Sequence, residues 1–237
     1  MGVHAGPEII GMPYEGHGVT DGLVLYLDAS DKASYPGSGT TWYDLTGHDN
    51  FSCPNSLSVR DLARGVVFDT ASGANGLGSS THADWRTTSE CTIETWHYMD
   101  TPHTGCCQTI FGRYHFRLFQ INQSIYFMFG LNNSGSVTYT HPSFAITDDA
   151  WHHCVATRRS GNMILRIDGV EKYNTAWNSG LDLWGSNESN GSGIESWGIN
   201  SEAAHDIEYG IVKMYDRGLT DAEILYNYNS QRGRFGV

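Results

Sequence analysis

Basic residues are scarce in this sequence, and long hydrophobic runs are missing. Its 237 residues include 14 lysines and arginines against 26 aspartates and glutamates, a formal net charge of −12 at pH 7. Binding to nucleic-acid phosphates depends on lysine and arginine, so this balance argues against a nucleic-acid-binding protein. No segment reaches the roughly 18 consecutive apolar residues of a membrane-spanning helix. We therefore expect neither nucleic acid nor a membrane as a partner.

Targeting and disulfide patterns are also missing. Residues 1–11 have neither a basic start nor an apolar stretch, so we expect no signal peptide and synthesis in a reducing cytoplasm. The five cysteines are an odd number without a secretory context, which argues against a disulfide framework. The role of the adjacent Cys106 and Cys107 stays open.

Glycine, in contrast, is abundant: there are 28 glycines, with 12% aromatic and only 17% charged residues. This composition is typical of short strands and tight turns. Apolar spacing and turn-forming residues predict strands over residues 23–27, 65–69, 91–97, 109–113, 115–121, 124–129, 136–141, 151–157, 162–167, 170–173, 194–199 and 207–215. Residues 23–27 are apolar at every position, which indicates a strand buried on both faces.

Two short patterns predict a turn and a helix. Asp168-Gly169 is a preferred two-residue turn between hairpin strands. Thr220 and Glu223 have the spacing of a capping box, which marks the start of a helix. The apolar stripe expected to dock this helix consists of Ile224, Leu225 and Tyr228. Many strands and one short helix indicate an all-β protein, a β-sandwich formed by residues 22–237.

Residues 1–21 form a different kind of segment, with prolines and glycines and little periodicity. One interpretation is a disordered terminus. The other is an extended arm that becomes ordered against a neighbouring subunit. The apolar side chains available for such an arm are Ile9, Ile10, Met12 and Tyr14.

The order of several segments resembles the laminin-G-like branch of the concanavalin A-like lectin/glucanase superfamily. These segments are residues 22–28, 39–47, 67–69, 92–96, 151–157, 165–169 and 210–219. The resemblance spans residues 22–237 and implies a jelly-roll sandwich of two antiparallel sheets. Residues 226–237 are similar to the ending of such domains in bacteriophage structural proteins, which implies a virion component. Fold alone does not determine function in this superfamily.

Glu90 and Glu94 are the residues to consider for hydrolysis. The superfamily's β-glucanases use two glutamates and an intervening aspartate that alternate along one strand, and here Thr92 occupies the middle position. Retaining glycosidases need two carboxyl groups about 5–5.5 Å apart. The same segment is also an ordinary core strand of non-catalytic laminin-G-like domains. We therefore expect a protein that is not an enzyme.

Metal binding is a second kind of chemistry to consider. Many members of the superfamily bind calcium, which prefers clustered oxygen ligands. Asp44, Asp49 and Asn50 lie in one turn-rich loop and Asp69 lies in another, so these four residues are the predicted calcium ligands. The alternative is that the short polar side chains form Asx turns with their own backbone.

A zinc site would draw on His97, His103, Cys106 and Cys107. Adjacent cysteines do not easily bind one tetrahedral ion. We therefore favour a turn with incidental thiols.

Sugar binding combines aromatic rings with amide and carboxylate groups. One glycine- and asparagine-rich stretch has this mixture, and its predicted carbohydrate-binding residues are Trp177, Asn178, Trp184 and Asn187. Tryptophans also pack between sheets, and the same surface could contact another subunit.

Together these observations favour a non-enzymatic virion structural protein of a bacteriophage, either a capsid decoration or a fibre or tail component. Its expected partners are other virion proteins, copies of itself in a symmetric oligomer, and host-surface glycans. The alternative is a lectin for cell-surface glycans, and the third possibility is a β-glucan endohydrolase.

Overall fold

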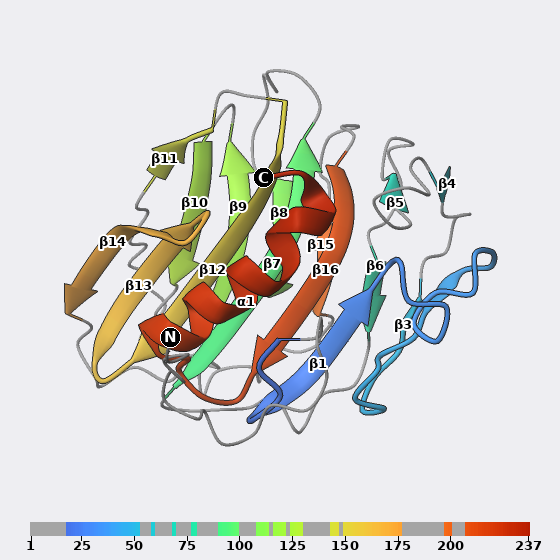
Figure 1. The fold of residues 1–237 in the computed structure, drawn as a ribbon, viewed down its shortest axis with the longest axis horizontal. Helices are drawn as coiled ribbons and strands as arrows, with labels where there is room; N and C mark the ends of the chain where they lie inside the picture. Colours follow the sequence, from blue (N-terminus) through green and yellow to red (C-terminus); the bar gives the residue numbers. More distant parts are fainter. Residues whose placement is uncertain are drawn as a thin grey trace, which may run out of the picture.

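The computed structural model describes residues 18–52, 58–59, 68–69, 77–79, 90–99, 108–113, 116–121, 124–129, 143–146, 149–176, 197–200 and 207–237. These residues form antiparallel sheets and one helix (Figure 1). The six-stranded sheet has the order β1 (Leu23–Asp28), β16 (Ile207–Tyr215), β7 (Cys91–Met99), β12 (Trp151–Arg159), β13 (Asn162–Ile167) and β14 (Val170–Ala176).

The second sheet has eight strands. Its order is β11 (Ser143–Ala145), β10 (Ser124–Phe129), β9 (Phe116–Ile121), β8 (Gln108–Arg113), β15 (Trp197–Asn200), β6 (Leu77–Ser79), β3 (Phe51–Ser52) and β2 (Thr41–Trp42). β4 (Ser58–Val59) and β5 (Phe68–Asp69) form a separate two-stranded pair. This architecture confirms the predicted all-β sandwich with one short C-terminal helix.

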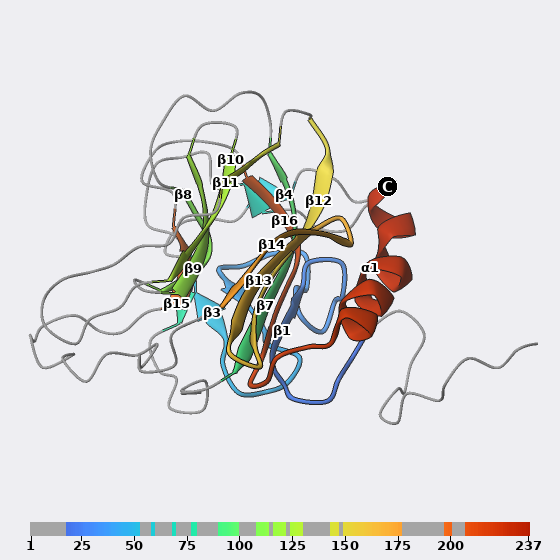
Figure 2. The same ribbon diagram turned by 90° about the vertical axis from the view of Figure 1, so that its left-hand side faces the viewer.

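The two large sheets face each other, and α1 (Asp221–Phe235) lies on the outer face of the six-stranded sheet (Figure 2). The core between the sheets contains fully buried side chains from both layers, such as Leu27, Ile93, Phe111 and Phe127. Burying this apolar surface is the main stabilising contribution to such a fold.

The middle of the six-stranded sheet is buried on both faces because α1 covers part of its outer side (Figure 2), whereas the edge strand β14 is largely exposed. In β1, Leu25 and Leu27 point into the core between the sheets, whereas Tyr26 packs with Trp96 and Phe235 under α1. The prediction of a strand buried on both faces is therefore confirmed for residues 24–27, whereas Leu23 at the start of β1 is partly buried.

Tight hairpins connect β12, β13 and β14. Asp168 and Gly169 have φ angles of 52° and 75°, so both adopt the left-handed conformation of a type I′ turn. Ser160 and Gly161 have the same pair of φ angles between β12 and β13. The hairpin predicted at Asp168-Gly169 is confirmed.

The helix begins as the capping box predicts. The Thr220 side chain accepts a hydrogen bond from the Glu223 backbone N–H, and the Glu223 carboxylate accepts one from the Thr220 N–H. The predicted docking stripe is only partly correct. Ile224 is buried, but Leu225 is 48% exposed. Residues 224, 227, 231 and 235 follow the helical repeat, so Asn227 and Gln231 occupy the inner face instead.

Five short strands were not predicted from the sequence: β2, β3, β4, β6 and β11. Each has only two or three residues, too few to show a periodic pattern. The strand predicted at residues 136–141 lies outside the described residues. So do Ile9, Ile10, Met12 and Tyr14 of the proposed arm.

Residues 18–21 pack against the sandwich. Val19 is 3% exposed and belongs to a cluster with Val155, Tyr215 and Ile224. Its backbone N–H donates to Asn227 Oδ1 at 2.7 Å, and its carbonyl accepts a hydrogen bond from the Tyr215 hydroxyl at 3.0 Å. The segment before β1 is thus fixed between the sheet and α1.

Candidate functional site

Glu94 and Thr92 lie on the outer face of β7, as the sequence alternation predicts. Thr92 Oγ1 donates to the Arg217 carbonyl and accepts from the Leu219 N–H. Glu90, immediately before the strand, accepts a hydrogen bond from the Ser160 N–H at 2.7 Å. Thr92, where the glucanases carry an aspartate, therefore holds the segment that leads into α1.

Glu94 is completely buried beneath α1. One carboxylate oxygen lies 3.6 Å from Lys213 Nζ and 3.3 Å from His153 Nε2. The other accepts a hydrogen bond from Asn227 Nδ2 at 2.6 Å. Lys213 and Asn227 are also fully buried. A charged carboxylate in such a position requires this pairing, because an unpaired buried charge is very costly.

Electrostatics keep this carboxylate ionised. Burial by itself raises the pKa of Glu94, but Lys213, His153 and Asn227 outweigh it and lower the pKa to about 2. For Lys213, burial lowers the pKa, while Glu94 and Asp28 oppose that change. Lys213 and Asn227 were not predicted from the sequence as members of this cluster. The available indication was a lysine between Val212 and Met214 in an apolar strand.

Aromatic rings cover the next part of the same face. Trp96 stacks on Phe235 with ring centroids 4.4 Å apart and on Tyr228 at 5.8 Å. Its indole N–H donates to Gln231 Oε1 at 2.8 Å. These contacts hold α1 in place above Glu94. A polysaccharide therefore has no access to this carboxylate, and Glu90 and Glu94 do not form a glycosidase site here.

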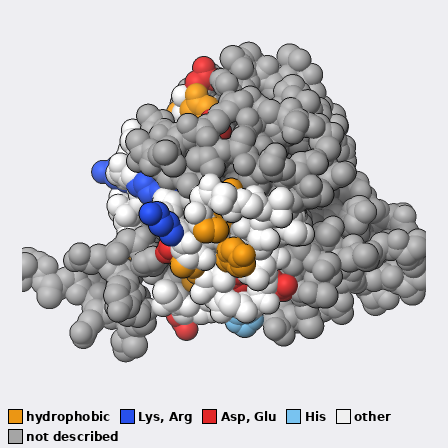
Figure 3. Space-filling view, turned by 90° about the vertical axis from the view of Figure 1, so that its right-hand side faces the viewer, with side chains coloured by type: hydrophobic (Ala, Val, Ile, Leu, Met, Phe, Trp, Pro, Cys, Tyr) orange, Lys and Arg blue, Asp and Glu red, His pale blue; other side chains and the backbone are white. Residues whose placement is uncertain are grey.

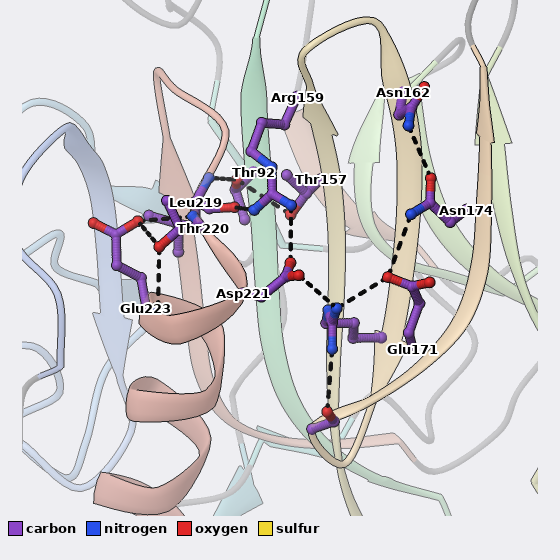
Figure 4. Close-up of polar contacts among 12 residues, drawn as sticks. Thr92, Thr157, Arg159, Asn162, Glu171, Asn174, Leu219, Thr220, Asp221 and Glu223 are labelled. Carbon is purple, nitrogen blue, oxygen red and sulfur yellow. Dashed lines mark hydrogen bonds and ion pairs between the residues drawn. The ribbon is translucent and has the colours of Figure 1, made fainter.

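An exposed polar surface lies where the start of α1 meets β12, β13 and β14 (Figure 4). Asp221 binds Arg159 at 2.9 Å and Arg166 at 3.2 Å, and Arg166 also binds Glu171 at 2.9 Å. Asn174 continues this chain, since its amide donates to Glu171 at 3.4 Å. Surface ion pairs contribute little to stability, but their charges and amides are available for recognition.

Exposed hydrophobic side chains are a further feature of the surface. Among the residues that the structure describes, the large hydrophobic side chains at least 40% exposed are Tyr43, Val170, Leu225 and Val237. On the face over the strands at the right of Figure 1, several hydrophobic groups lie together among the other described atoms, with lysine and arginine at one edge (Figure 3). Isolated exposed apolar residues are normal in folded proteins, so this surface by itself indicates no partner.

The predicted calcium ligands have other interactions. The two Asp44 oxygens accept hydrogen bonds from the N–H groups of Tyr26, Thr46, His48 and Asp49 and from the Thr46 hydroxyl. Asn50 Oδ1 accepts from the Asp44 N–H at 3.1 Å. These oxygens are occupied by donors of the turn and by the Tyr26 N–H of β1, so Asp44 does not fit as a calcium ligand in this arrangement. The Asp69 side chain lies outside the described residues, and the site stays a prediction.

Histidines and cysteines do not assemble a metal site in the described part of the chain, which contains no group of three or more potential His, Cys, Asp or Glu ligands. His103, Cys106 and Cys107 lie outside it. Cys91 and Cys154 are buried free thiols, and burial raises the pKa of Cys91 to about 12. A thiol needs a low pKa to act as a nucleophile, so the buried setting of Cys91 disfavours the reactive thiolate.

The predicted carbohydrate-binding residues Trp177, Asn178, Trp184 and Asn187 lie outside the described residues. Their position in the chain is nevertheless informative. They follow β14 in the chain, and the described part of β14 ends at Ala176, next to Asn162 on β13.

The fold is similar to those of several solved structures. The binding domain of Paraclostridial Mosquitocidal Protein 1 matches with a TM-score of 0.68 and 14% identity, over 88% of this chain and 52% of that chain. The binding domain of Botulinum neurotoxin DC, in complex with rat synaptotagmin II, gives 0.67 and 13%, over 89% and 52%. Trypanosoma rangeli sialidase, in complex with sialic acid, gives 0.57 and 17%, over 90% and 33%.

This chain thus spans about half the length of the two toxin binding domains. Such low identities establish the fold and leave activity open. A comparison with curated protein sequences finds no match. Among the described residues, no helix has the length and apolar character needed to cross a membrane.

The sequence of residues 72–225 matches the family Laminin_G_3, described as the concanavalin A-like lectin/glucanases superfamily. This match covers more than half of the chain and agrees with the two-sheet architecture, so the protein belongs to the concanavalin A-like lectin/glucanase superfamily.

Proposed function

We propose that this domain is a non-catalytic binding module that attaches to a carbohydrate-bearing surface. The observation that carries the proposal is the burial of Glu94, whose carboxylate lies under α1 and holds Lys213 and Asn227. Glycoside hydrolysis needs two carboxyl groups that reach the sugar, and this one cannot. The toxin binding domains with a similar fold support attachment, whereas the sialidase makes hydrolysis the alternative to test.

The predicted binding residues follow β14 in the chain: Trp177, Asn178, Trp184 and Asn187. Beside the end of β14, the Asn162 amide donates to Asn174 Oδ1 at 3.1 Å on the exposed surface. Amide donors and acceptors next to aromatic side chains match the hydroxyl groups and apolar faces of a sugar. We place the glycan site at this end of the six-stranded sheet.

A glycan array tests the binding role. The full chain should bind one class of glycan, and Trp177→Ala or Trp184→Ala should weaken binding about tenfold or more, roughly 1.4 kcal/mol. Tyr43→Ala is the matched control, because it removes an aromatic ring that is 43% exposed in the loop between β2 and β3. Equal binding by the tryptophan variants, or no bound glycan, would overturn this assignment.

Activity assays separate binding from hydrolysis. The protein should release neither reducing sugar from β-glucan nor sialic acid from sialylated glycans. Glycosidase activity that disappears in Glu94→Gln would contradict the non-catalytic proposal, because it would require α1 to leave the sheet.

The setting that we propose is a bacteriophage virion, where the domain would be a capsid decoration or a fibre or tail component. The support is the similarity of residues 226–237 to the ending of such domains in phage structural proteins. Copies of this chain and other virion proteins would then be its partners. Mass spectrometry of purified particles, with antibody labelling in electron micrographs, should find this chain at a fixed copy number; its absence from particles would reject this setting.

A further inference from the structure

Three buried side chains under α1 form an arrangement that neither glycan binding nor assembly uses. Lys213 on β16 and Glu94 on β7 are cross-strand neighbours, and Asn227 reaches them from α1. All three are 0% exposed. One Glu94 oxygen lies 3.6 Å from the Lys213 amine, and the other accepts a hydrogen bond from the Asn227 amide at 2.6 Å. A single carboxylate therefore contacts both an amine and a carboxamide.

The lysine nitrogen and the Asn227 carboxamide carbon are also close to each other. A Cβ atom at Gly18 would lie 2.9 Å from Lys213 Nζ and 3.1 Å from Asn227 Cγ, so the two atoms are within about 6 Å of each other. Any side chain at position 18 would press against both groups. Glycine at this position, with φ of 80°, leaves room for the amine and the carboxamide to meet.

Neighbouring groups activate the carboxamide. Its oxygen accepts the Val19 backbone N–H at 2.7 Å, and a fixed donor at this atom stabilises negative charge that develops on it. Its nitrogen donates to the Tyr215 hydroxyl at 3.1 Å. Burial lowers the pKa of Lys213, which favours the neutral and nucleophilic amine.

We propose that Lys213 and Asn227 form an intramolecular isopeptide bond, with Glu94 as the catalytic residue that transfers protons. Glu94 takes a proton from the ammonium group, and the neutral Nζ attacks Asn227 Cγ. The Nζ–Cγ bond forms and the Cγ–Nδ2 bond breaks. Both protons lost by Nζ end on the departing nitrogen, which leaves as ammonium, and Glu94 returns to its carboxylate form. No oxidant, reductant or other reactant is required.

The cross-link would join β16 to α1 through the side chains. Holding the reacting groups together in the folded protein supplies the favourable geometry that such a reaction needs. The product replaces a buried ammonium by a neutral amide, whose N–H can donate to Glu94. The bond would secure α1 over the sheet and would prevent its local detachment.

Intact mass spectrometry of the denatured full chain tests this proposal directly. The observed mass should be about 17 Da below the sequence mass, because one ammonia is lost. Trypsin should then give a branched peptide in which residues 173–217 are joined to residues 218–232. A succinimide at Asn75-Gly76 or Asn190-Gly191 would produce the same loss of mass, and the branched peptide distinguishes the cross-link from it.

Variants test the role of each group. Glu94→Gln, Lys213→Arg and Asn227→Leu should each have the full sequence mass and no branched peptide. Lys172→Arg, at an exposed position on β14, is the matched control and should keep the loss. If these buried variants do not fold, the mass and the tryptic peptides of the chain with its original sequence still test the proposal. A full-mass chain that trypsin cleaves completely after Lys213 would overturn the proposal.

Discussion

Arg234 on α1 forms a bidentate ion pair with Asp28 on β1. The Nη2–Oδ1 distance is 2.8 Å and the Nη1–Oδ2 distance is 2.9 Å. Asp28 is buried and also accepts hydrogen bonds from the Tyr26 hydroxyl and from Ser30. Burial raises the pKa of Asp28, but Arg234 and Ser30 outweigh it and hold the pKa below its usual value. The pair joins the helix to the first strand of the sheet.

Removing this arginine should destabilise the fold. Arg234→Ala leaves a buried carboxylate without its partner, and we expect a loss of about 3 kcal/mol in the free energy of unfolding, measured in urea. Arg234→Lys should lose less, since it keeps the charge. Lys172→Ala on the surface should change stability by less than about 0.5 kcal/mol.

The ion pair should also make stability depend on pH. Because the pKa of Asp28 is lower in the folded protein than the ordinary value of 3.8, the pair stabilises the fold above pH 3.8. The loss of stability in Arg234→Ala should therefore become smaller as the pH falls below that value. A loss in the free energy of unfolding that is the same at every pH would contradict this account.

Two glycines in equivalent turns allow a matched comparison. Gly161 and Gly169 both have φ of 75°. A Cβ at Gly161 would meet nothing within 4 Å, whereas one at Gly169 would lie 3.2 Å from Tyr228 and 3.4 Å from Leu225 of α1. Gly161→Ala should therefore cost only the backbone strain, about 1 kcal/mol. Gly169→Ala should cost roughly 1 kcal/mol more, because it also presses on the helix. Equal losses in urea unfolding would show that the turn does not support α1.

His97 should make the protein sensitive to mild acid. It is fully buried in β7, its Nδ1 lies 3.1 Å from Thr95 Oγ1, and its Nε2 has no hydrogen-bond partner among the described residues. Burial, aided by His152, lowers the pKa of His97 from 6.5 to about 3. The unfolded chain therefore binds a proton below pH 6.5 that the folded protein does not, and stability should fall with decreasing pH by up to about 1.4 kcal/mol per pH unit.

The variant His97→Phe tests this dependence, since it cannot take up a proton and has a similar size. Its unfolding free energy should change less than that of the unmodified protein between pH 6.5 and 5. Parallel pH profiles for the two proteins would assign the acid sensitivity to other groups.

The parts of the fold that the sequence predicts correctly depend on local patterns. The alternation in β7, the Asp168-Gly169 turn and the capping box at Thr220 each involve residues that are neighbours in the chain. Leu225 shows where such patterns fail, because this hydrophobic residue, one position away from the buried stripe, is 48% exposed. Asn227 takes a buried position because it has partners on the sheet.

The buried cluster could not be predicted for a related reason. Lys213 and Glu94 become neighbours only through the register between β16 and β7, and the sequence does not contain that register in any local form. Glu94 was identified from its spacing to Glu90, but whether it faced solvent or a helix depended on where α1 docks. Polar groups in the interior are therefore the least predictable part of this protein.

Calcium should have little effect on stability. Asp44 uses both carboxylate oxygens for hydrogen bonds within its own turn, including those from the Thr46 and His48 N–H groups. We expect the melting temperature to be the same, within about 1 °C, in calcium and in EDTA. Asp44→Ala should lower it in both conditions, because five donors lose their acceptor. A rise with calcium that Asp44→Ala or Asp49→Ala abolishes would establish the calcium site predicted from the sequence.

Two truncations separate the arm from the fold. A chain that starts at Gly18 keeps Val19 between Asn227 and Tyr215. A chain that starts at Gly22 loses this buried valine, its two hydrogen bonds, and the contacts of Thr20 and Asp21 with Leu23 and Arg217. The shorter chain should be less stable by roughly 3 kcal/mol in urea unfolding.

Light scattering after size exclusion measures assembly of the same truncated chains. If the arm side chains Ile9 and Tyr14 hold an oligomer, the full chain is oligomeric and the chain that starts at Gly18 is already a monomer. An oligomer that survives in the chain from Gly18 would place the contact on the sandwich, and equal stability of the two truncations would show that Val19 does not secure α1.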